Sequence, residues 1–285
     1  MENQHSEMNH NKQTIGSLLL DAGKLKAEDA DRIIKAQKQF GLLFGDAAVK
    51  LGLITEDDIL QVVSKQFNYS CLSMEDEAID KKVIAAFQSF GPEVEALRSL
   101  RSQLSLRWFA ENRSLVIAAP KAGAGSSYIA ANLAVMFAQV GQKTLLVDAN
   151  LRAPSQHGLF KCTNKSGLSD VLVKRAGLDA IQTISGIDKL SLLTAGTIPP
   201  NPLELLGHSK FAKLSLELEQ QFEIIIIDTP AMLDHPDAQI ISSIVKGSLL
   251  VVQKNKSELA DIEAAKKQIL VAGAEPVGVV INRLG

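Results

Sequence analysis

The sequence predicts an α/β protein in which a doubly wound, mostly parallel sheet follows a small helical domain. The chain has 285 residues, more than one hydrophobic core usually organises, so two domains are expected. Its N-terminal part contains an internal repeat of helical pattern. From Leu115 onward, short apolar runs alternate with helical stretches, which is typical of right-handed crossovers between parallel strands that are covered on both faces.

The amino-acid composition limits the classes of function that this protein can have. The chain is 46% hydrophobic and 22% charged with a net charge of -2, which suits a soluble globular protein and gives no electrostatic case for nucleic-acid binding. Cys71 and Cys162 lie far apart without metal-ligand spacing, so two reduced thiols are expected. The apolar runs are shorter than the ~20 residues that cross a bilayer. Residues 1–12 are polar and are predicted to be a disordered tail.

The repeat defines the predicted N-terminal domain, residues 13–72. A shift of 29 residues superimposes Gly16 on Gly45 and Gly23 on Gly52. Each copy begins with a short helix and a glycine stop, and then continues with a second helix that carries acidic residues in its first turn and closes with a glutamine. The sequence therefore predicts two helical hairpins.

Residues 73–91 are mixed in character and acidic at first, and they are predicted to be a linker. The second domain is predicted over residues 92–285. It begins with an amphipathic helix from Pro92 to Trp108. The strands expected after that helix are apolar runs, namely residues 115–119, 144–149, 190–195, 223–230, 248–253 and 276–282. The helices expected between them cover residues 128–140, a stretch near Leu168, residues 202–219, a stretch near Ala238 and residues 257–272.

A small-residue loop follows the first of these strands. Residues 119–128 read APKAGAGSSY, and such a loop lets backbone N–H groups cradle an anion in front of a helix N-terminus. The pattern is a degenerate phosphate loop, because Pro120 replaces its first glycine and Ser126 its lysine. An ordinary tight turn between strand and helix is the competing interpretation. If a nucleotide binds, the predicted contacts are Lys121, Ala122, Gly123, Ala124, Gly125, Ser126, Ser127 and Tyr128.

Two apolar strands end in aspartate. Asp148 follows LLV and Asp228 follows IIII. Ligands of open parallel sheets bind at the carboxyl ends of the strands, where phosphate-loop enzymes place acidic residues that hold magnesium or act as a base. We therefore predict Asp148 and Asp228 as catalytic residues and, together with the hydroxyl of Ser127, as the Mg²⁺ site. A turn aspartate at a strand end is the alternative for each.

Taken in order, several segments resemble the bacterial chain-length-determinant tyrosine kinases of exopolysaccharide operons, in their EpsG-like branch. The matching segments are EALRSLR, the degenerate phosphate loop with SYIAANLAV, LLVDANLR, QHGLF, GLSDVL, AGTIPPNPLELL, EIIIIDTPAMLDHPDAQ and GVVIN. The resemblance implies a phosphate-loop, deviant-Walker ATPase fold. It also implies a cytoplasmic protein that is held at the inner membrane by a transmembrane polysaccharide co-polymerase and assembles into a homo-oligomeric ring. The family's ring motif maps onto Glu95, Arg98 and Arg101, where a solvated charged stripe is the alternative.

Departures from the family pattern weaken the case for catalysis. Ser126 supplies no charge to the phosphates, and Ala124 stands where the family loop has an acidic residue. Asn150 replaces the second aspartate of the Asp-x-Asp pair and cannot act as a base. Losing one charged contact at a transition state typically costs a few kcal/mol. We therefore expect a regulator of polysaccharide chain length, polymerisation and export that binds ATP or ADP with Mg²⁺ but has weak or lost kinase activity. Lys121 could act as a surrogate phosphate contact, or it could be a surface lysine.

Three other functions remain open. One is a fully active tyrosine autokinase whose missing contacts come from a neighbouring subunit, although only Tyr69 and Tyr128 are present as acceptors. Another is a cyclic di-GMP-responsive module, because the repeat resembles the N-terminal domains of secretion and pilus ATPases. Thr14 and Leu43 replace the ligand-pairing arginine of that motif, so a docking module is the alternative. The last is a partition-type ATPase acting on DNA, which the near-neutral charge and the PPNPLELL segment disfavour.

Overall fold

The computed structural model describes residues 14–56, 58–59, 62 and 71–283. The predicted tail at residues 1–12 and the end of the second repeat copy lie outside the described residues. The chain divides into two compact units, residues 1–71 and 72–285, and each is described by itself. Within the described ranges, every helix is too short or too polar to cross a bilayer.

The first unit contains helices α1 (Ile15–Asp21), α2 (Ala27–Phe40) and α3 (Phe44–Lys50). The first helix of each repeat copy is followed by a glycine with positive φ, Gly23 at 67° and Gly52 at 66°, a conformation that glycine adopts at little cost. The N-terminus of the helix after Gly52 is capped by Thr55, whose hydroxyl accepts the backbone N–H of Asp58 at 3.2 Å. Leu19 and Ile33 are fully buried in the core of this unit.

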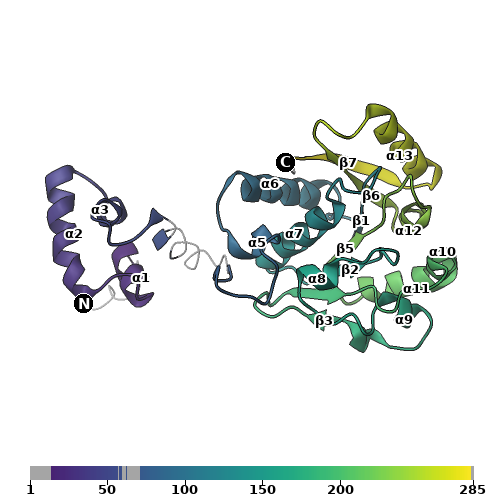
Figure 1. Cartoon of the computed structure of the whole chain (residues 1–285), viewed down its shortest axis with the longest axis horizontal. Helices are drawn as coiled ribbons and strands as arrows, with labels where there is room; N and C mark the ends of the chain where they lie inside the picture. The colour runs from purple at the N-terminus through teal and green to yellow at the C-terminus, as the bar shows by residue number, and fades with distance from the viewer. Residues whose placement is uncertain (1–13, 57, 60–61, 63–70, 284–285) are drawn as a thin grey trace, which may run out of the picture. The chain divides into compact units, whose positions relative to one another are not determined.

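The second unit is built on a seven-stranded sheet in the order β3-β4-β2-β5-β1-β6-β7 (Figure 1). Only the short edge strand β3 is antiparallel to its neighbour, which confirms the predicted mostly parallel sheet. The strands are β1 (Ser114–Ala118), β2 (Thr144–Asp148), β3 (Gln182–Thr183), β4 (Leu190–Leu193), β5 (Ile224–Asp228), β6 (Gly247–Gln253) and β7 (Glu275–Asn282).

Helices cover both faces of this sheet (Figure 1). Alternate residues of a strand point to opposite faces, so Leu115 and Ile117 pack toward α6 and α7, whereas Val116 belongs to the other core together with residues of α11, α12 and α13. The helices are α5 (Ile84–Phe87), α6 (Pro92–Arg107), α7 (Ser126–Gln139), α8 (Gln156–Leu159), α9 (Leu168–Leu172), α10 (Pro202–Leu206), α11 (His208–Glu219), α12 (Asp237–Val245) and α13 (Leu259–Val271).

The segment that was expected to be a linker, residues 73–91, differs from that expectation in its second half. Ile79 and Val83 are fully buried in the core beside α7, and α5 follows them. The side chain of Asn132 on α7 fixes this segment, because its Oδ1 accepts the backbone N–H of Ala85 at 2.9 Å. Residues 79–87 therefore form part of the second unit.

The helix that was predicted over residues 202–219 is two helices. It breaks at Gly207, whose ψ of 138° is not helical. The short strand β3 and the one-turn helix α8 were not predicted, because each is shorter than the pattern that identifies a strand or a helix from sequence. Helix α8 lies next to the predicted site.

Candidate functional site

The loop between β1 and α7 has the backbone of an anion cradle. Gly123 and Gly125 have φ values of 85° and 91°, which side chains other than hydrogen rarely permit. Gly125 is also the N-cap of the 14-residue helix α7, so the free N–H groups of that helix open onto the loop. The glycines at these two positions are therefore required by the backbone conformation.

Neighbouring strand ends hold this loop in place. The backbone N–H of Met232, beyond β5, donates to the carbonyl of Ala119 at 2.8 Å. The side-chain amide of Asn282, the last residue of β7, donates to the carbonyl of Ala124 at 3.0 Å. Hydrogen bonds from the ends of two strands thus fix the loop from both sides.

The two predicted carboxylates meet beside the loop. Asp148 and Asp228 are register partners at the carboxyl ends of the adjacent strands β2 and β5, and both are fully buried. The Oδ2 atom of Asp148 accepts the backbone N–H groups of Ser155 at 3.0 Å and of Gln156 at 2.9 Å. These bonds fix the Asp148 carboxylate through the backbone of α8 and its N-cap.

Asp228 is held differently. Its Oδ2 accepts the side-chain amide of Gln156 at 2.7 Å, and the side chain of Ser127 also hydrogen-bonds to the carboxylate. Its Oδ1 is buried and has no hydrogen-bond partner among the described residues. A buried oxygen without a partner is costly in a ligand-free protein, and a cation would compensate it.

The electrostatics of the pair follow from this burial. Removal from water raises the pKa of Asp148 to about 6, although three backbone N–H groups act in the opposite direction. Burial and then the neighbouring carboxylate of Asp148 raise the pKa of Asp228 to about 7. Burial and the neighbouring negative charge thus favour the protonated form of Asp228, which a bound cation would reverse.

Gln156 was not predicted as a site residue. Its side-chain nitrogen donates to the backbone carbonyl of Ser127 at 3.1 Å as well as to Asp228, so this one side chain joins α8, the start of α7 and the end of β5. Its Oε1 is buried without a partner among the described residues. One feature of the sequence points to Gln156. It is an uncharged polar residue that begins the segment QHGLF, a few residues after the aspartate of β2.

The residues after Asp148 are arranged by two further contacts. The side-chain oxygen of Asn150, the residue at the second position of the expected Asp-x-Asp pair, accepts the backbone N–H of Ala153 at 3.1 Å and so closes a local turn. Arg152 forms a bidentate ion pair with the fully buried carboxylate of Asp237 at the start of α12, with a shortest distance of 3.1 Å. This pair ties the β2 loop to the other face of the sheet.

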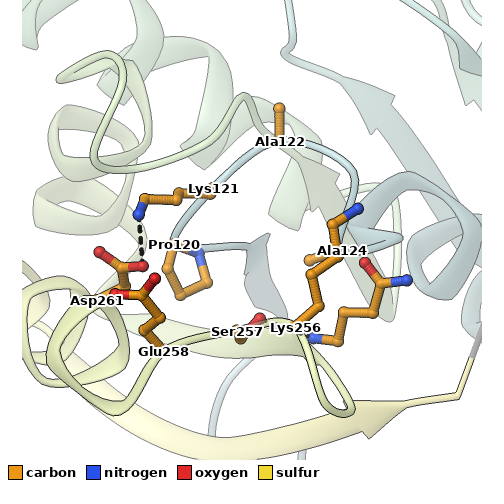
Figure 2. A pocket seen from close by; sticks show the side chains of 9 residues that line it. Pro120, Lys121, Ala122, Ala124, Lys256, Ser257, Glu258 and Asp261 are labelled. Atoms are coloured by element: carbon orange, nitrogen blue, oxygen red, sulfur yellow. Dashed lines mark hydrogen bonds and ion pairs between the residues drawn. The ribbon is translucent and has the colours of Figure 1, made fainter.

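Lys121 is turned away from the loop. Its ammonium forms an ion pair with Asp261 on α13 at 2.6 Å, which Figure 2 shows as a dashed line across a pocket. Asp261 raises the pKa of Lys121 through a hydrogen bond. Ser126 and Ser127 are the first two residues of α7, and both are half-buried, as is Tyr128. The structure thus places Ser126 and Ser127 at the loop, while the charge of Lys121 is paired with α13.

The predicted ring motif lies on α6, and all three of its side chains have partners within the chain. Arg98 pairs with Glu95 and donates to the carbonyl of Ser89 at 3.0 Å. Arg101 donates to the carbonyl of Met136 on α7 at 3.4 Å. Glu95 is the more exposed member of its ion pair, with 56% of its side chain accessible. The role of these residues in a ring stays a prediction.

The donor set fits Mg²⁺. This ion takes oxygen ligands, keeps several waters and is usually held by one or two carboxylates together with substrate phosphates. Asp148, Asp228 and Ser127 offer such oxygens, and the unpartnered Oδ1 of Asp228 is the atom that most needs a cation. In the part of the chain that the structure describes, no group of three or more acidic, histidine or cysteine side chains is arranged to hold a metal ion by itself.

A sheet with this strand order and a glycine loop of this shape in front of α7 makes the second unit a P-loop α/β domain. The MinD protein of Pyrococcus horikoshii, solved as a complex with Mg-ADP, has a TM-score of 0.52 at 26% identity over 61% of this chain and 71% of that one. The chimerical protein CapA2B2 has a TM-score of 0.68 at 36% identity and covers 81% of this chain and 99% of that one. The kinase domain of Escherichia coli tyrosine kinase Etk has a TM-score of 0.63 at 31% identity, covering 66% and 74%.

Sequence relatives narrow this class to one family. No family model matches the chain. The putative tyrosine-protein kinase CapB of Staphylococcus aureus is 38% identical over 67% of this chain and 84% of that protein. Tyrosine-protein kinase YwqD of Bacillus subtilis is 35% identical over 72% and 86%. A putative tyrosine-protein kinase in the cps region of Klebsiella pneumoniae is 31% identical over 80% of this chain but only 31% of its own length. The chain belongs to the bacterial tyrosine-protein kinase family, which confirms the resemblance seen in its motifs.

Proposed function

We propose that this chain is a regulator of exopolysaccharide chain length, polymerisation and export that binds ATP or ADP with Mg²⁺ while its tyrosine phosphotransfer is weakened or lost. The observation that carries the proposal is the loop of residues 119–125, held open by Gly123 and Gly125 beside two buried carboxylates. Family membership and the Mg-ADP complex of the MinD neighbour support nucleotide as the ligand.

In this assignment the backbone N–H groups of the loop and the start of α7 bind the phosphates. Ser127, Asp148 and Asp228 hold Mg²⁺, which when bound neutralises charge on the phosphate oxygens. Gln156 and the backbone of α8 orient the two carboxylates. Each of these functions needs only backbone groups, carboxylates and a hydroxyl, all of which the chain supplies.

The proposal that tyrosine phosphotransfer is weakened is based on two substitutions, at positions 126 and 150. Ser126 has a short, uncharged side chain where the loop normally carries its lysine. Asn150 cannot accept a proton, and its oxygen is engaged with Ala153. Electrostatic stabilisation of the transferring phosphoryl group is the main catalytic device of this chemistry, so these losses act on transfer more than on binding.

Calorimetry with ATP and ADP, each with and without Mg²⁺, tests the binding part of the proposal. The expected result is saturable binding that Mg²⁺ strengthens, and no binding at millimolar nucleotide would refute it. Incubation of the full chain with ATP, Mg²⁺ and its co-polymerase tests the transfer part. Rapid phosphorylation of tyrosine in either protein would instead establish the second candidate, an active tyrosine kinase, which the names of the relatives favour.

The partner and the first unit complete the proposal. Family membership supports docking on a membrane-spanning polysaccharide co-polymerase at the inner membrane, with Glu95, Arg98 and Arg101 at contacts between subunits of a ring. For the first unit we propose a docking function. Leu43, which stands at the position of the ligand-pairing arginine in related cyclic di-GMP motifs, is 76% exposed and apolar. Saturable binding of cyclic di-GMP to the full chain at micromolar concentration would replace docking with nucleotide sensing.

A further inference from the structure

A pocket of about 150 Å³ adjoins the phosphate loop (Figure 2). One wall is the loop itself, from Pro120 to Ala124, and the other is the turn that leads from β6 into α13, including Lys256 and Ser257. A ligand whose phosphates lie on the loop would therefore lie next to this turn. The pocket contains two lysines, Lys121 and Lys256, and their surroundings differ.

Lys121 is neutralised within the chain. Its ammonium pairs with Asp261 at 2.6 Å, and Glu258, the N-cap of α13, lines the same pocket. To contact a phosphate, Lys121 would have to give up this ion pair and leave the Asp261 carboxylate beside the incoming anion. Breaking an exposed ion pair costs little, but the Asp261 carboxylate left beside the phosphate would repel it, so Lys121 is a poor surrogate for the missing loop lysine.

Lys256 has no acidic partner within 4.0 Å among the residues that the structure describes. It lies on the opposite side of the pocket from the Lys121 and Asp261 pair in Figure 2. Two hydrogen bonds close the turn that carries Lys256. The Ser257 N–H donates to the Gln253 carbonyl at 3.0 Å, and the Gln253 N–H donates to the Ser257 hydroxyl at 2.9 Å. A defined turn thus presents to the loop an ammonium that carries no ion pair.

We infer that Lys256 supplies, from the β6–α13 turn, the cation that position 126 lacks, and that it donates to the phosphate oxygens of a nucleotide seated on the loop. A lysine is a compact charge on a flexible stem, so it can serve a phosphate from a different element of the fold. Ser126, the first residue of α7, has a short and uncharged side chain and supplies no competing cation at the loop. The inference rests on the proposed nucleotide binding and adds the residue that compensates for the degenerate loop.

Calorimetry on the full chain tests this with ADP, inorganic tripolyphosphate and adenosine as probes. Lys256→Gln is expected to lower the affinity for ADP and for tripolyphosphate by ~10-fold, the usual effect of losing one charge-assisted bond. The affinity for adenosine, which has no phosphate, should not change. Lys254→Gln is the matched control, because Lys254 is exposed in the same turn but does not line the pocket. This control is expected to bind all three probes as the wild type does.

A double variant tests directly whether Lys256 replaces the lysine that is missing at position 126. If Lys256 supplies the charge of the missing lysine, Ser126→Lys should raise ADP affinity by a larger factor in the Lys256→Gln background than in the wild type, so that the two changes are not additive. Three results would each overturn the inference and leave nucleotide binding standing. They are equal ADP affinity in Lys256→Gln and Lys254→Gln, an equal loss of affinity for adenosine, and an equal gain in ADP affinity from Ser126→Lys in the wild type and in Lys256→Gln. Failure of the wild type to bind either ADP or tripolyphosphate would refute the proposed function itself.

Discussion

Asp148 and Asp228 face each other across two adjacent parallel strands, and neither carboxylate is exposed to solvent. The arrangement suits a cation and is unfavourable without one, because burial and mutual repulsion penalise two negative charges. Nearby donors are directed at one oxygen of Asp228, Oδ2, while its Oδ1 has no partner in the described part of the chain. Part of the stability of this fold therefore depends on what occupies the site.

The first prediction is a pH-dependent stability of the protein without nucleotide and Mg²⁺. The pKa of Asp228 is raised from 3.8 to about 7, so the folded state keeps a proton that the unfolded chain loses near pH 4. The resulting stabilisation is complete below pH 4 and is lost as pH rises through 7. At ~1.4 kcal/mol for each pH unit between the two pKa values, the effect amounts to a few kcal/mol.

Thermal unfolding from pH 5 to pH 8 measures this effect. Asp228→Asn should flatten the dependence and raise the Tm at pH 8, whereas Glu275→Gln, at an exposed position on β7, should keep the wild-type slope. If Tm depends on pH as steeply in Asp228→Asn as in the wild type, the protonation of Asp228 is not the cause of the pH dependence.

The second prediction concerns Gln156. Replacement by leucine keeps the volume but removes the donor to Asp228 and to the carbonyl of Ser127, so each of these buried acceptors loses a hydrogen bond. We expect a loss of ~1–3 kcal/mol in the free energy of unfolding. We also expect Mg²⁺ to strengthen ADP binding less than it does in the wild type, because the Asp228 carboxylate is no longer oriented.

Denaturant unfolding and calorimetry with and without Mg²⁺ separate these effects. Gln220→Leu, at an exposed position after α11, is the matched control and should change neither quantity. If Gln156→Leu lowers stability but leaves the Mg²⁺ effect on ADP affinity intact, Gln156 has a structural role only.

The third prediction is that the ion pair of Arg152 and Asp237 stabilises the fold only as a pair. Asp237 is fully buried, so Arg152→Ala leaves a charge without its partner and should cost ~3 kcal/mol. The double variant with Asp237→Ala should recover part of that loss. Arg107→Ala, at the exposed end of α6, serves as the control in the same unfolding experiment. Equal stabilities of Arg152→Ala and Arg107→Ala would contradict this account.

The parts of the fold that sequence could predict are those with a strong local pattern. Asp148 and Asp228 each end an apolar strand, and parallel strands bring such ends to one edge, so their meeting followed from topology alone. The glycine loop was likewise visible from its composition. Its degenerate positions could be identified because the surrounding segments match the family in order.

Other features depended on contacts that sequence does not encode locally. The partner of Lys121 is Asp261, on a helix far along the chain, so the ion pair that neutralises this lysine could not be foreseen. Residues 79–87 were expected to belong to a linker because acidic residues precede them, yet Ile79 and Val83 are buried. Gln156 was missed because a one-turn helix gives no periodic pattern.

The last prediction is that kinase chemistry can be restored in steps. Ser126→Lys places a charge on the first residue of α7, in the loop position that normally contacts phosphate, and should tighten the binding of ADP and ATP, by a smaller factor than in the Lys256→Gln background. Binding alone does not supply a base or an additional charge near Mg²⁺, so transfer should stay low in this variant. Adding Asn150→Asp returns the second carboxylate of the Asp-x-Asp pair, and tyrosine phosphorylation should then rise by ~100-fold or more over the wild type.

The design compares four proteins, namely the wild type, each single variant and the double variant, in the same phosphotransfer assay with the co-polymerase. Ser126→Ala is the control for changes in loop packing, and it should leave both binding and transfer at wild-type levels. A large gain in transfer from Asn150→Asp alone would mean that the cation inferred at Lys256 is sufficient for transfer. No gain in the double variant, despite tighter nucleotide binding, would place the defect outside these two positions and contradict the view that lost charges limit transfer.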